Sequence, residues 1–234
     1  MDAVELQRTY LDLTTPHVAD ACMRLGIPVR CAPAGMRPLW EGLHLVGRAR
    51  PARHAGSVDV FLEVVENADP GDVLVVDNGG RRDEACVGDL VTLEVGRAGL
   101  AGIIIWGLHR DTAELRTIRL PVFSEGVLPV GPQRLDPQDP EALVSARVGD
   151  HLVTTDDVVL GDDDGVLFLP ISRAADIAEA ARSIRDTERV QAARMANGRT
   201  LRSQAKFTEF LAARDADGRT FREHLRSLGG AIEE

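Results

Sequence analysis

Lysine is almost absent from this chain, which contains 26 arginines but a single lysine, Lys206. An enzyme that forms an imine with its substrate needs a lysine amine. Lys206 is therefore the single candidate for imine formation, and it lies in the polar, helix-prone C-terminal part of the sequence.

Cysteines and paired metal ligands are also scarce. Cys22, Cys31 and Cys86 are odd in number and show no C-x-x-C spacing, which argues against a disulfide framework and suits reduced thiols in a cytoplasm. The histidines include no pair at the spacing of two ligands on one helix, so a zinc site is not expected. The histidines are His17, His44, His54, His109, His151 and His224.

Long hydrophobic runs and an excess of positive charge are missing as well. The longest apolar run, residues 100–108, is far too short to cross a bilayer, and the first five residues lack the basic and apolar regions of a signal peptide. A net charge of −10 opposes binding to nucleic-acid phosphates. We expect a soluble, cytoplasmic protein without nucleic-acid or membrane partners.

What is present is the composition of a globular α/β domain. With 234 residues, 44% of them hydrophobic, the chain has enough apolar material to bury one core. Strand-like and helix-like patterns alternate along it, which predicts a mixed α/β fold. Strands are expected at residues 43–53, 72–77, 101–106, 120–123, 144–148, 158–160 and 166–169, and helices at residues 15–26, 58–65 and 89–98.

The character of the sequence changes at Ser172. Alanines and charges with apolar residues at helical intervals predict a helix over residues 173–196, capped by Ser172, with further helices over 201–214 and around 221–228. This tail has few large apolar side chains for a core of its own. We therefore divide the chain into an α/β core of residues 1–170 and a helical extension of residues 171–234, which packs on the core or on a neighbouring subunit.

The densest polar motif combines Gly88-Asp89-Leu90-Val91 with Arg110-Asp111, and twenty residues separate Asp89 from Arg110. Asp89 opens a predicted helix and Arg110 follows a predicted strand, and such ends commonly meet in one crevice of an α/β sheet. Free amides of Leu90 and Val91 would then hold a substrate carboxylate. Arg110 offers a planar, charged fork for a carboxylate or enolate, and Asp111 is a hard oxygen ligand for Mg²⁺ or Mn²⁺.

The same residues also fit a structural interpretation. Asp111 to Glu114 resembles a helix-capping arrangement, and Asp89 also has the side chain to cap the helix that it opens. The loop 77–83 has the composition either of a plain turn or of a segment that faces the same crevice. His109 adjoins the motif, although neighbouring side chains on a strand point in different directions.

Two superficial motifs are rejected. His109-Arg110-Asp111 resembles a kinase catalytic loop, but Arg116 occupies the position of the required asparagine and no glycine-rich loop precedes it. Aligning Gly165 with the glycine of a calcium loop puts Leu160 and Ile171 at ligand positions, so the three aspartates before Gly165 are expected to form a polar turn.

Several segments together resemble the RraA-like family, which includes the class II pyruvate aldolases that act on 4-hydroxy-4-methyl-2-oxoglutarate and 4-carboxy-4-hydroxy-2-oxoadipate. The resemblance covers roughly residues 10 to 170. The segments that carry it, in order, are Thr15 to Gly26, Gly71 to Asp77, Gly88-Asp89-Leu90, Gly107 to Asp111, Pro121-Val122-Phe123 and Asp164-Gly165-Val166.

The resemblance implies a swivelling β/β/α fold, a homotrimer or homohexamer, and a role for each motif residue. Asp111 would hold the divalent metal, Mg²⁺ or Mn²⁺, and Arg110 would contact the substrate. Asp89 would orient metal-bound water, and the backbone of Gly88, Asp89, Leu90 and Val91 would bind the substrate carboxylate.

The implied activity is that of a metal-dependent lyase on a small 2-oxo acid. Cleaving the C–C bond beside a 2-oxo group leaves an enolate, which an imine or a Lewis acid must stabilise, and the lysine content favours the Lewis acid. Aldol cleavage and oxaloacetate decarboxylation share a pyruvate enolate, so both stay open. The alternative is a regulator like RraA, which binds a ribonuclease. A methyltransferase is less favoured, because no G-x-G-x-x-G loop is present.

Overall fold

The structure is a computed structural model that describes residues 1–228, and it divides into two compact units. Unit 1 consists of residues 1–15 and 28–175. Unit 2 consists of residues 16–27 and the chain from residue 176 on. All the site residues predicted from the sequence belong to unit 1.

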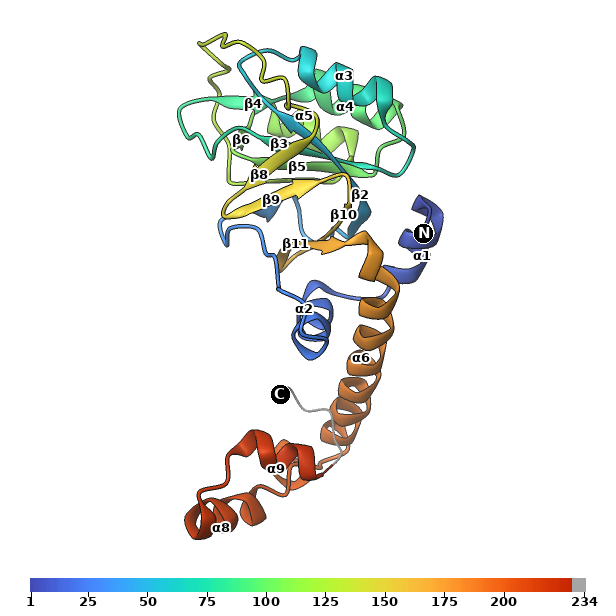
Figure 1. The fold of residues 1–234 in the computed structure, drawn as a ribbon, viewed down its shortest axis with the longest axis vertical. Helices are drawn as coiled ribbons and strands as arrows, with labels where there is room; N and C mark the ends of the chain where they lie inside the picture. The colour runs from blue at the N-terminus through green and yellow to red at the C-terminus, as the bar shows by residue number, and fades with distance from the viewer. Residues whose placement is uncertain (229–234) are drawn as a thin grey trace. The chain divides into compact units, whose positions relative to one another are not determined.

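A seven-stranded sheet forms the centre of unit 1 (Figure 1). Its order is β1-β7-β5-β3-β2-β10-β11, in which the four neighbours β7, β5, β3 and β2 run parallel and the remaining strands run antiparallel to their neighbours. The strands are β1 (Arg37–Pro38), β2 (Leu45–Arg53), β3 (Val73–Asp77), β5 (Gly102–Trp106), β7 (Val122–Ser124), β10 (Asp157–Asp162) and β11 (Gly165–Pro170).

Both faces of this sheet are buried, which explains the nearly continuous apolar runs of β3 and β5. Side chains alternate between the faces of a strand. Leu74 and Val76 therefore enter one core together with Ile103, whereas Val73 and Val75 enter the other.

Helices cover one face and a hairpin covers the other, which gives the β/β/α layering. The helices α3 (Asp59–Asn67), α4 (Asp89–Arg97) and α5 (Thr112–Ile118) contribute apolar side chains such as Phe61, Val95 and Leu115 to the first core. The strands β8 (Ser145–Val148) and β9 (His151–Thr154) contribute apolar side chains to the second core. The predicted fold class is confirmed.

Several elements of unit 1 were not predicted. Helix α1 (Ala3–Tyr10) is capped by Asp2, and its Tyr10 hydroxyl donates a hydrogen bond to the Ala174 carbonyl. The strands β4 (Ala85–Val87) and β6 (Leu108–His109) form a separate parallel pair. This pair places the two halves of the predicted motif, Gly88-Asp89 and Arg110-Asp111, side by side.

Unit 2 is helical. It contains nearly all of α2 (Thr15–Arg24), most of α6 (Ala174–Ala196), and α7 (Leu201–Gln204), α8 (Phe207–Asp217) and α9 (Phe221–Ser227). His17 Nε2 of α2 lies 3.2 Å from Glu188 Oε2 of α6. Phe207, Phe210 and Phe221 pack edge-on or tilted against one another. Packing of the tail on a neighbouring subunit stays a prediction.

Two predictions for the tail were wrong in detail. Ser172 is not the cap of the long helix, because it lies within the 3-10 turn Ile171–Arg173 that leads into α6. The helix predicted over residues 201–214 is broken at Lys206, whose φ of 47° is left-handed and interrupts a right-handed helix. Residues 229–234 of the predicted extension lie outside the described part of the chain.

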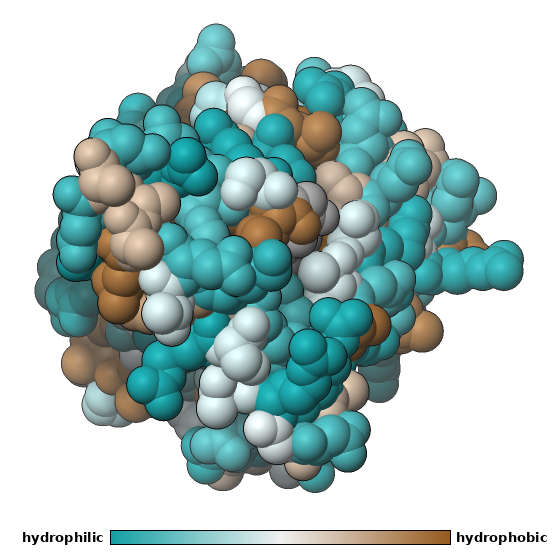
Figure 2. Space-filling model, turned by 90° about the horizontal axis from the view of Figure 1, so that it is seen from below, coloured by the Kyte–Doolittle hydropathy of each residue, from teal (hydrophilic) through white to brown (hydrophobic). Residues whose placement is uncertain are grey.

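Among residues 1–228, no helix combines the length and the apolar composition needed to span a bilayer. The face drawn in Figure 2 is mostly hydrophilic, and its hydrophobic side chains form small separate groups. Cys22, Cys31 and Cys86 are unpaired in the structure, with Cys22 and Cys86 buried and Cys31 exposed.

Candidate functional site

The two halves of the predicted motif meet because β4 and β6 pair in parallel. The chain leaves these strands side by side, and the Arg110 amide donates a hydrogen bond of 3.0 Å to the Val87 carbonyl. Gly88-Asp89 therefore lies directly beside Arg110-Asp111. Residues 90–109, which separate Asp89 from Arg110, form most of α4, then β5, and then β6, which pairs with β4.

The Asp111 side chain does not cap helix α5, although Asp111 is the residue at the N-cap position. It precedes α5 in a left-handed conformation with φ of 58°, and its side chain makes no capping hydrogen bond to that helix. Its Oδ2 instead accepts a hydrogen bond of 3.3 Å from the Asp89 amide. Left-handed backbone is unfavourable for a non-glycine residue and is common at functional sites. The capping interpretation therefore fails for Asp111.

Gly88 leaves the space that the Arg110 and Asp111 side chains occupy. A Cβ atom at Gly88 would lie less than 3.0 Å from Asp111 Oδ2 and 3.2 Å from Arg110 Nε. Arg110 Nε is 3.5 Å from Asp111 Oδ2, and Arg110 remains 47% exposed. The guanidinium is thus held loosely and keeps donor capacity for a ligand.

The first turn of α4 is less open than the sequence suggested. Asp89 Oδ1 accepts a hydrogen bond of 2.8 Å from the Leu90 amide, so Leu90 N–H is engaged by the preceding carboxylate and is not free. No acceptor for the Val91 amide is found among residues 1–228. The expectation of two free amides was therefore wrong for Leu90.

A cavity of about 580 Å³ adjoins these residues. Gly88, Asp89, Leu90, Val91 and Arg110 all line it. A cavity of this size accepts a small organic acid. The structure therefore gathers the predicted substrate-binding residues around one hollow, with Asp111 behind Gly88.

The donor set fits an alkaline-earth or manganese ion better than zinc. Among the described residues, no group of three or more His, Cys, Asp or Glu side chains converges on one point. Zinc sites need three or four protein ligands. Mg²⁺ commonly uses one or two carboxylates and completes its shell with water. Asp111 is 35% exposed and supplies oxygen donors of that kind.

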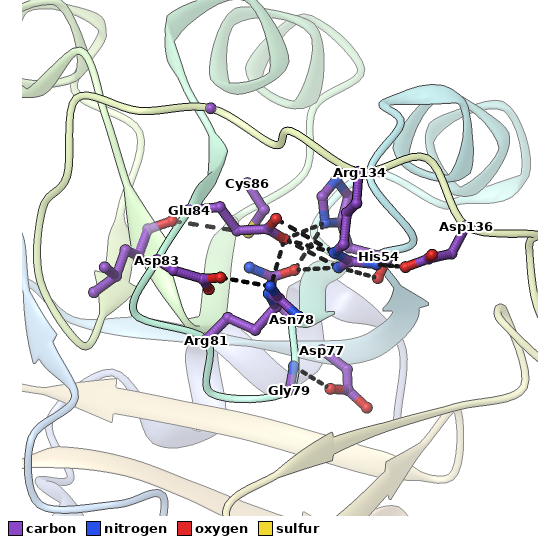
Figure 3. A network of polar contacts seen from close by, with 12 residues as sticks. His54, Asp77, Asn78, Gly79, Arg81, Asp83, Glu84, Cys86, Arg134 and Asp136 are labelled. Atoms are coloured by element: carbon purple, nitrogen blue, oxygen red, sulfur yellow. Dashed lines mark hydrogen bonds and ion pairs between the residues drawn. The ribbon is translucent and has the colours of Figure 1, made fainter.

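A second polar cluster beside the cavity was not predicted (Figure 3). Glu84 is buried, and Arg134 Nη2 donates to its Oε1 at 3.0 Å. Asn78 and His54 complete the cluster, since His54 Nδ1 lies 2.8 Å from Asn78 Oδ1. His54 also lines the cavity. The loop 77–83 does not line the cavity itself, but its Asn78 contacts His54, which does.

His109 points away from this cavity. Its Nδ1 lies 2.7 Å from Ser124 Oγ and its Nε2 3.1 Å from Thr112 Oγ1, and with these residues it lines a different hollow. Burial lowers the pKa of the His109 imidazole. It is a buried structural histidine beside the motif.

Comparisons with known proteins agree with the resemblance seen in the sequence. The RraA-like family model, described as Aldolase/RraA, matches residues 15–168. Protein DlpA of Legionella pneumophila is 25% identical over 203 residues, which are 84% of this chain but 32% of the relative, so the chain spans about a third of that protein. A Halalkalibacterium halodurans protein, "Putative 4-hydroxy-4-methyl-2-oxoglutarate aldolase", is 27% identical over 63% of this chain and 70% of its own length.

A solved structure is also similar. Streptomyces coelicolor RraAS2, described as an unusual member of the RNase ES inhibitor RraA protein family, superposes with a TM-score of 0.71 at 30% identity. The likeness covers 80% of this chain and 96% of that one.

Proposed function

This chain belongs to the RraA-like family, and from that premise we propose that it is a divalent-metal-dependent lyase that cleaves a C–C bond of a small 2-oxo acid and releases pyruvate. One observation carries the proposal: Arg110 and Asp111 pack over the side-chain-free backbone of Gly88 at the wall of a cavity. The relative named as an aldolase supports the reaction class.

The residues at the polar wall of the cavity would bind the substrate. Arg110 presents a planar fork that suits a carboxylate or a 2-oxo oxygen. The start of α4 adds the Val91 amide and the positive end of the helix dipole. Asp89, which borders the same cavity, is placed to orient water beside the substrate.

Asp111, through a bound cation, and Arg110 would together stabilise the negative charge that develops on the substrate. A divalent cation held by Asp111 would act as a Lewis acid toward the 2-oxo group. Arg110 would stabilise the negative charge that grows on the substrate as the C–C bond breaks. Its partial exposure and its single loose contact with Asp111 leave its remaining N–H groups available for this role.

An imine mechanism has little support. Lys206, the only lysine, belongs to unit 2, whereas the residues that line the cavity belong to unit 1. Its Nζ lies 3.5 Å from Glu209 Oε2, and its side chain is 53% exposed. It has neither the burial nor the cationic neighbour that activates a lysine nucleophile.

We propose a homotrimer or homohexamer as the working form. Large apolar side chains stand exposed at the cavity, including Leu90 at 75%, Leu62 at 49% and Val58 at 49%. A neighbouring subunit would cover them. Light scattering of the purified protein tests this, and a monomer at micromolar concentration would contradict it.

The test of the activity is a panel of 2-oxo acids with a coupled pyruvate assay. Pyruvate release from 4-hydroxy-4-methyl-2-oxoglutarate, 4-carboxy-4-hydroxy-2-oxoadipate or oxaloacetate should stop in EDTA and return with Mg²⁺ or Mn²⁺. Full activity in the chelator would refute the metal assignment. No pyruvate from any substrate at added Mg²⁺ would refute the lyase.

A regulatory function is the second candidate, because the similar RraAS2 belongs to a family described by ribonuclease inhibition. In that case the chain would bind a ribonuclease and slow it without cleaving 2-oxo acids. Pull-down with a ribonuclease E-type enzyme, in parallel with the pyruvate assay, separates the two functions.

A further inference from the structure

His54 is held rigidly at the end of β2. Its amide donates a hydrogen bond of 2.9 Å to the Asp77 carbonyl at the end of β3. Its ring stacks on Phe61 of α3, with the ring centroids 5.3 Å apart and the planes within 10°. The side chain is 1% exposed. The imidazole therefore has one orientation.

The hydrogen bonds around the ring fix its tautomer (Figure 3). Asn78 Oδ1 lies 2.8 Å from His54 Nδ1 and also receives a hydrogen bond of 3.2 Å from Arg134 Nη2. A guanidinium can only donate, so the oxygen of the Asn78 amide faces both groups. His54 Nδ1 must then carry the hydrogen, and in the neutral ring the lone pair is on Nε2.

That lone pair has no partner. His54 Nε2 is buried and has no hydrogen-bond partner among the described residues. Leaving a buried polar atom unpaired is unfavourable, and such atoms in native proteins call for a ligand or water. His54 lines the cavity together with Gly88, Asp89 and Arg110. A ligand in the cavity with a hydroxyl group near Nε2 would supply the missing partner.

Burial favours the neutral form of His54. Burial is the largest influence and lowers the pKa of the imidazole, and Arg134 acts in the same direction. The Asn78 hydrogen bond, Glu84 with Oε1 3.8 Å from Nδ1, and Asp59 of α3 act in the opposite direction without overcoming burial. Glu84 is itself paired with Arg134 and Arg81. A neutral imidazole is able to accept a proton.

We propose that His54 Nε2 is the base that accepts the hydroxyl proton of the substrate during aldol cleavage, an inference that rests on the proposed lyase function. As the proton moves to Nε2, the C4–O bond becomes a carbonyl and the C3–C4 bond breaks. The electron pair of that bond passes into the enolate of the 2-oxo acid fragment. The proton on His54 then returns to C3 of the enolate, which gives pyruvate and a neutral ring.

Asn78 is a positioning residue in this scheme. It contacts the far nitrogen of the ring and, together with Arg134, holds the tautomer whose lone pair faces away from the Asn78 and Glu84 cluster. Substitution of Asn78 would leave the base in place and would permit the wrong tautomer.

The proposal separates two reactions that share an enolate. Oxaloacetate decarboxylation releases CO₂ from a carboxylate, and no hydroxyl proton has to be removed before the C–C bond breaks. A variant without the His54 base should therefore lose the cleavage of 4-hydroxy-4-methyl-2-oxoglutarate and keep the decarboxylation of oxaloacetate.

The experiment compares full-length wild type, His54→Asn and His151→Asn with both substrates at saturating Mg²⁺. Asparagine at position 54 retains a donor toward Asn78 and lacks the second nitrogen. We expect kcat for cleavage to fall by about 10²- to 10⁴-fold, the range for loss of a general base. Decarboxylation should change by less than about threefold, and the His151 variant should match wild type in both assays.

Three results would overturn the inference. Cleavage that persists in His54→Asn shows that another base acts, and equal loss of both reactions shows a structural role for His54. A wild type that decarboxylates oxaloacetate but does not cleave the hydroxy acid removes the reaction that His54 would serve. Absence of both wild-type reactions instead refutes the proposed function itself.

Discussion

Gly88 and Asp111 share a space that holds only one side chain. A Cβ atom at residue 88 would lie far inside van der Waals contact distance of Asp111 Oδ2. Gly88→Ala should therefore displace Asp111 and abolish the metal-dependent release of pyruvate, with little loss of folded protein. Steady-state kinetics with Mg²⁺ and circular dichroism would measure the two effects.

Gly96→Ala is the matched control, because it lies in the same helix, α4, and a Cβ there meets nothing within 4 Å. Replacing a mid-helix glycine by alanine stabilises a helix by up to about 1 kcal/mol. Activity should be unchanged and the melting temperature slightly raised. If the two variants are equally active, the packing of Asp111 on Gly88 is irrelevant to function.

Arg110 should matter through its shape as well as its charge. Arg110→Ala is expected to reduce kcat by about 10²- to 10³-fold, the usual cost of losing one group that stabilises transition-state charge. Arg110→Lys should recover only a part, since an ammonium lacks the planar fork. Both variants should remain folded, because the side chain is 47% exposed. Wild-type kinetics in Arg110→Ala would exclude the residue from catalysis.

Glu84 is expected to contribute to stability. Its side chain is 4% exposed and is paired with Arg134, so Glu84→Ala leaves a cation without its buried partner. Arg134 is 23% exposed and keeps its ion pair with Asp136, so the expected loss of unfolding free energy is about 1.5–3 kcal/mol, the range for a hydrogen bond to a charged group. The exposed neighbour Asp83 offers a control, since Asp83→Ala should leave stability unchanged. Chemical denaturation of both variants would decide, and similar midpoints would contradict the prediction.

Acid should destabilise the protein through its buried histidines. Burial lowers the pKa values of both His54 and His109, so the folded chain resists protonation where the unfolded chain accepts it. The unfolding free energy should be highest above pH 6.5 and fall below it, by up to about 1.4 kcal/mol per pH unit and per histidine. Urea denaturation at pH 7.5, 6.5 and 5.5 measures this. His54→Asn should flatten the dependence, and an unchanged dependence in that variant would contradict the prediction.

Much of the sheet could be predicted from local patterns. The runs that became β3 and β5 are apolar at nearly every position and lie between glycine-containing turns, which is typical of strands buried on both faces. The pair β4 and β6 could not be found in this way, because each strand has only two or three residues and is stabilised by a partner more than twenty residues away. The break in the helix at Lys206 could not be predicted either, because the fold and not a local sequence pattern places this residue in a left-handed conformation.

The site was predictable in part for the same reason. Asp89, Arg110 and Asp111 lie at the ends of successive elements, so spacing alone placed them near one another. His54, Asn78, Glu84 and Arg134 come from four separate segments and share no periodicity. The strongest local hint was the charge of Glu84 next to the apolar stretch Ala85–Val87, and it does not identify a partner.

The interleaving of the two units in the sequence imposes an order on folding. Residues 16–27 group with the helical segment from residue 176 on, so this early segment must wait until residues 28–175 have emerged from the ribosome before its partners are synthesised. During synthesis the α/β layers can close first, while the segment around His17 stays exposed to chaperones and proteases. A chain that terminates early would therefore leave the side chains of α2 that are buried in the folded protein, Val18, Ala21 and Cys22, without their later partners.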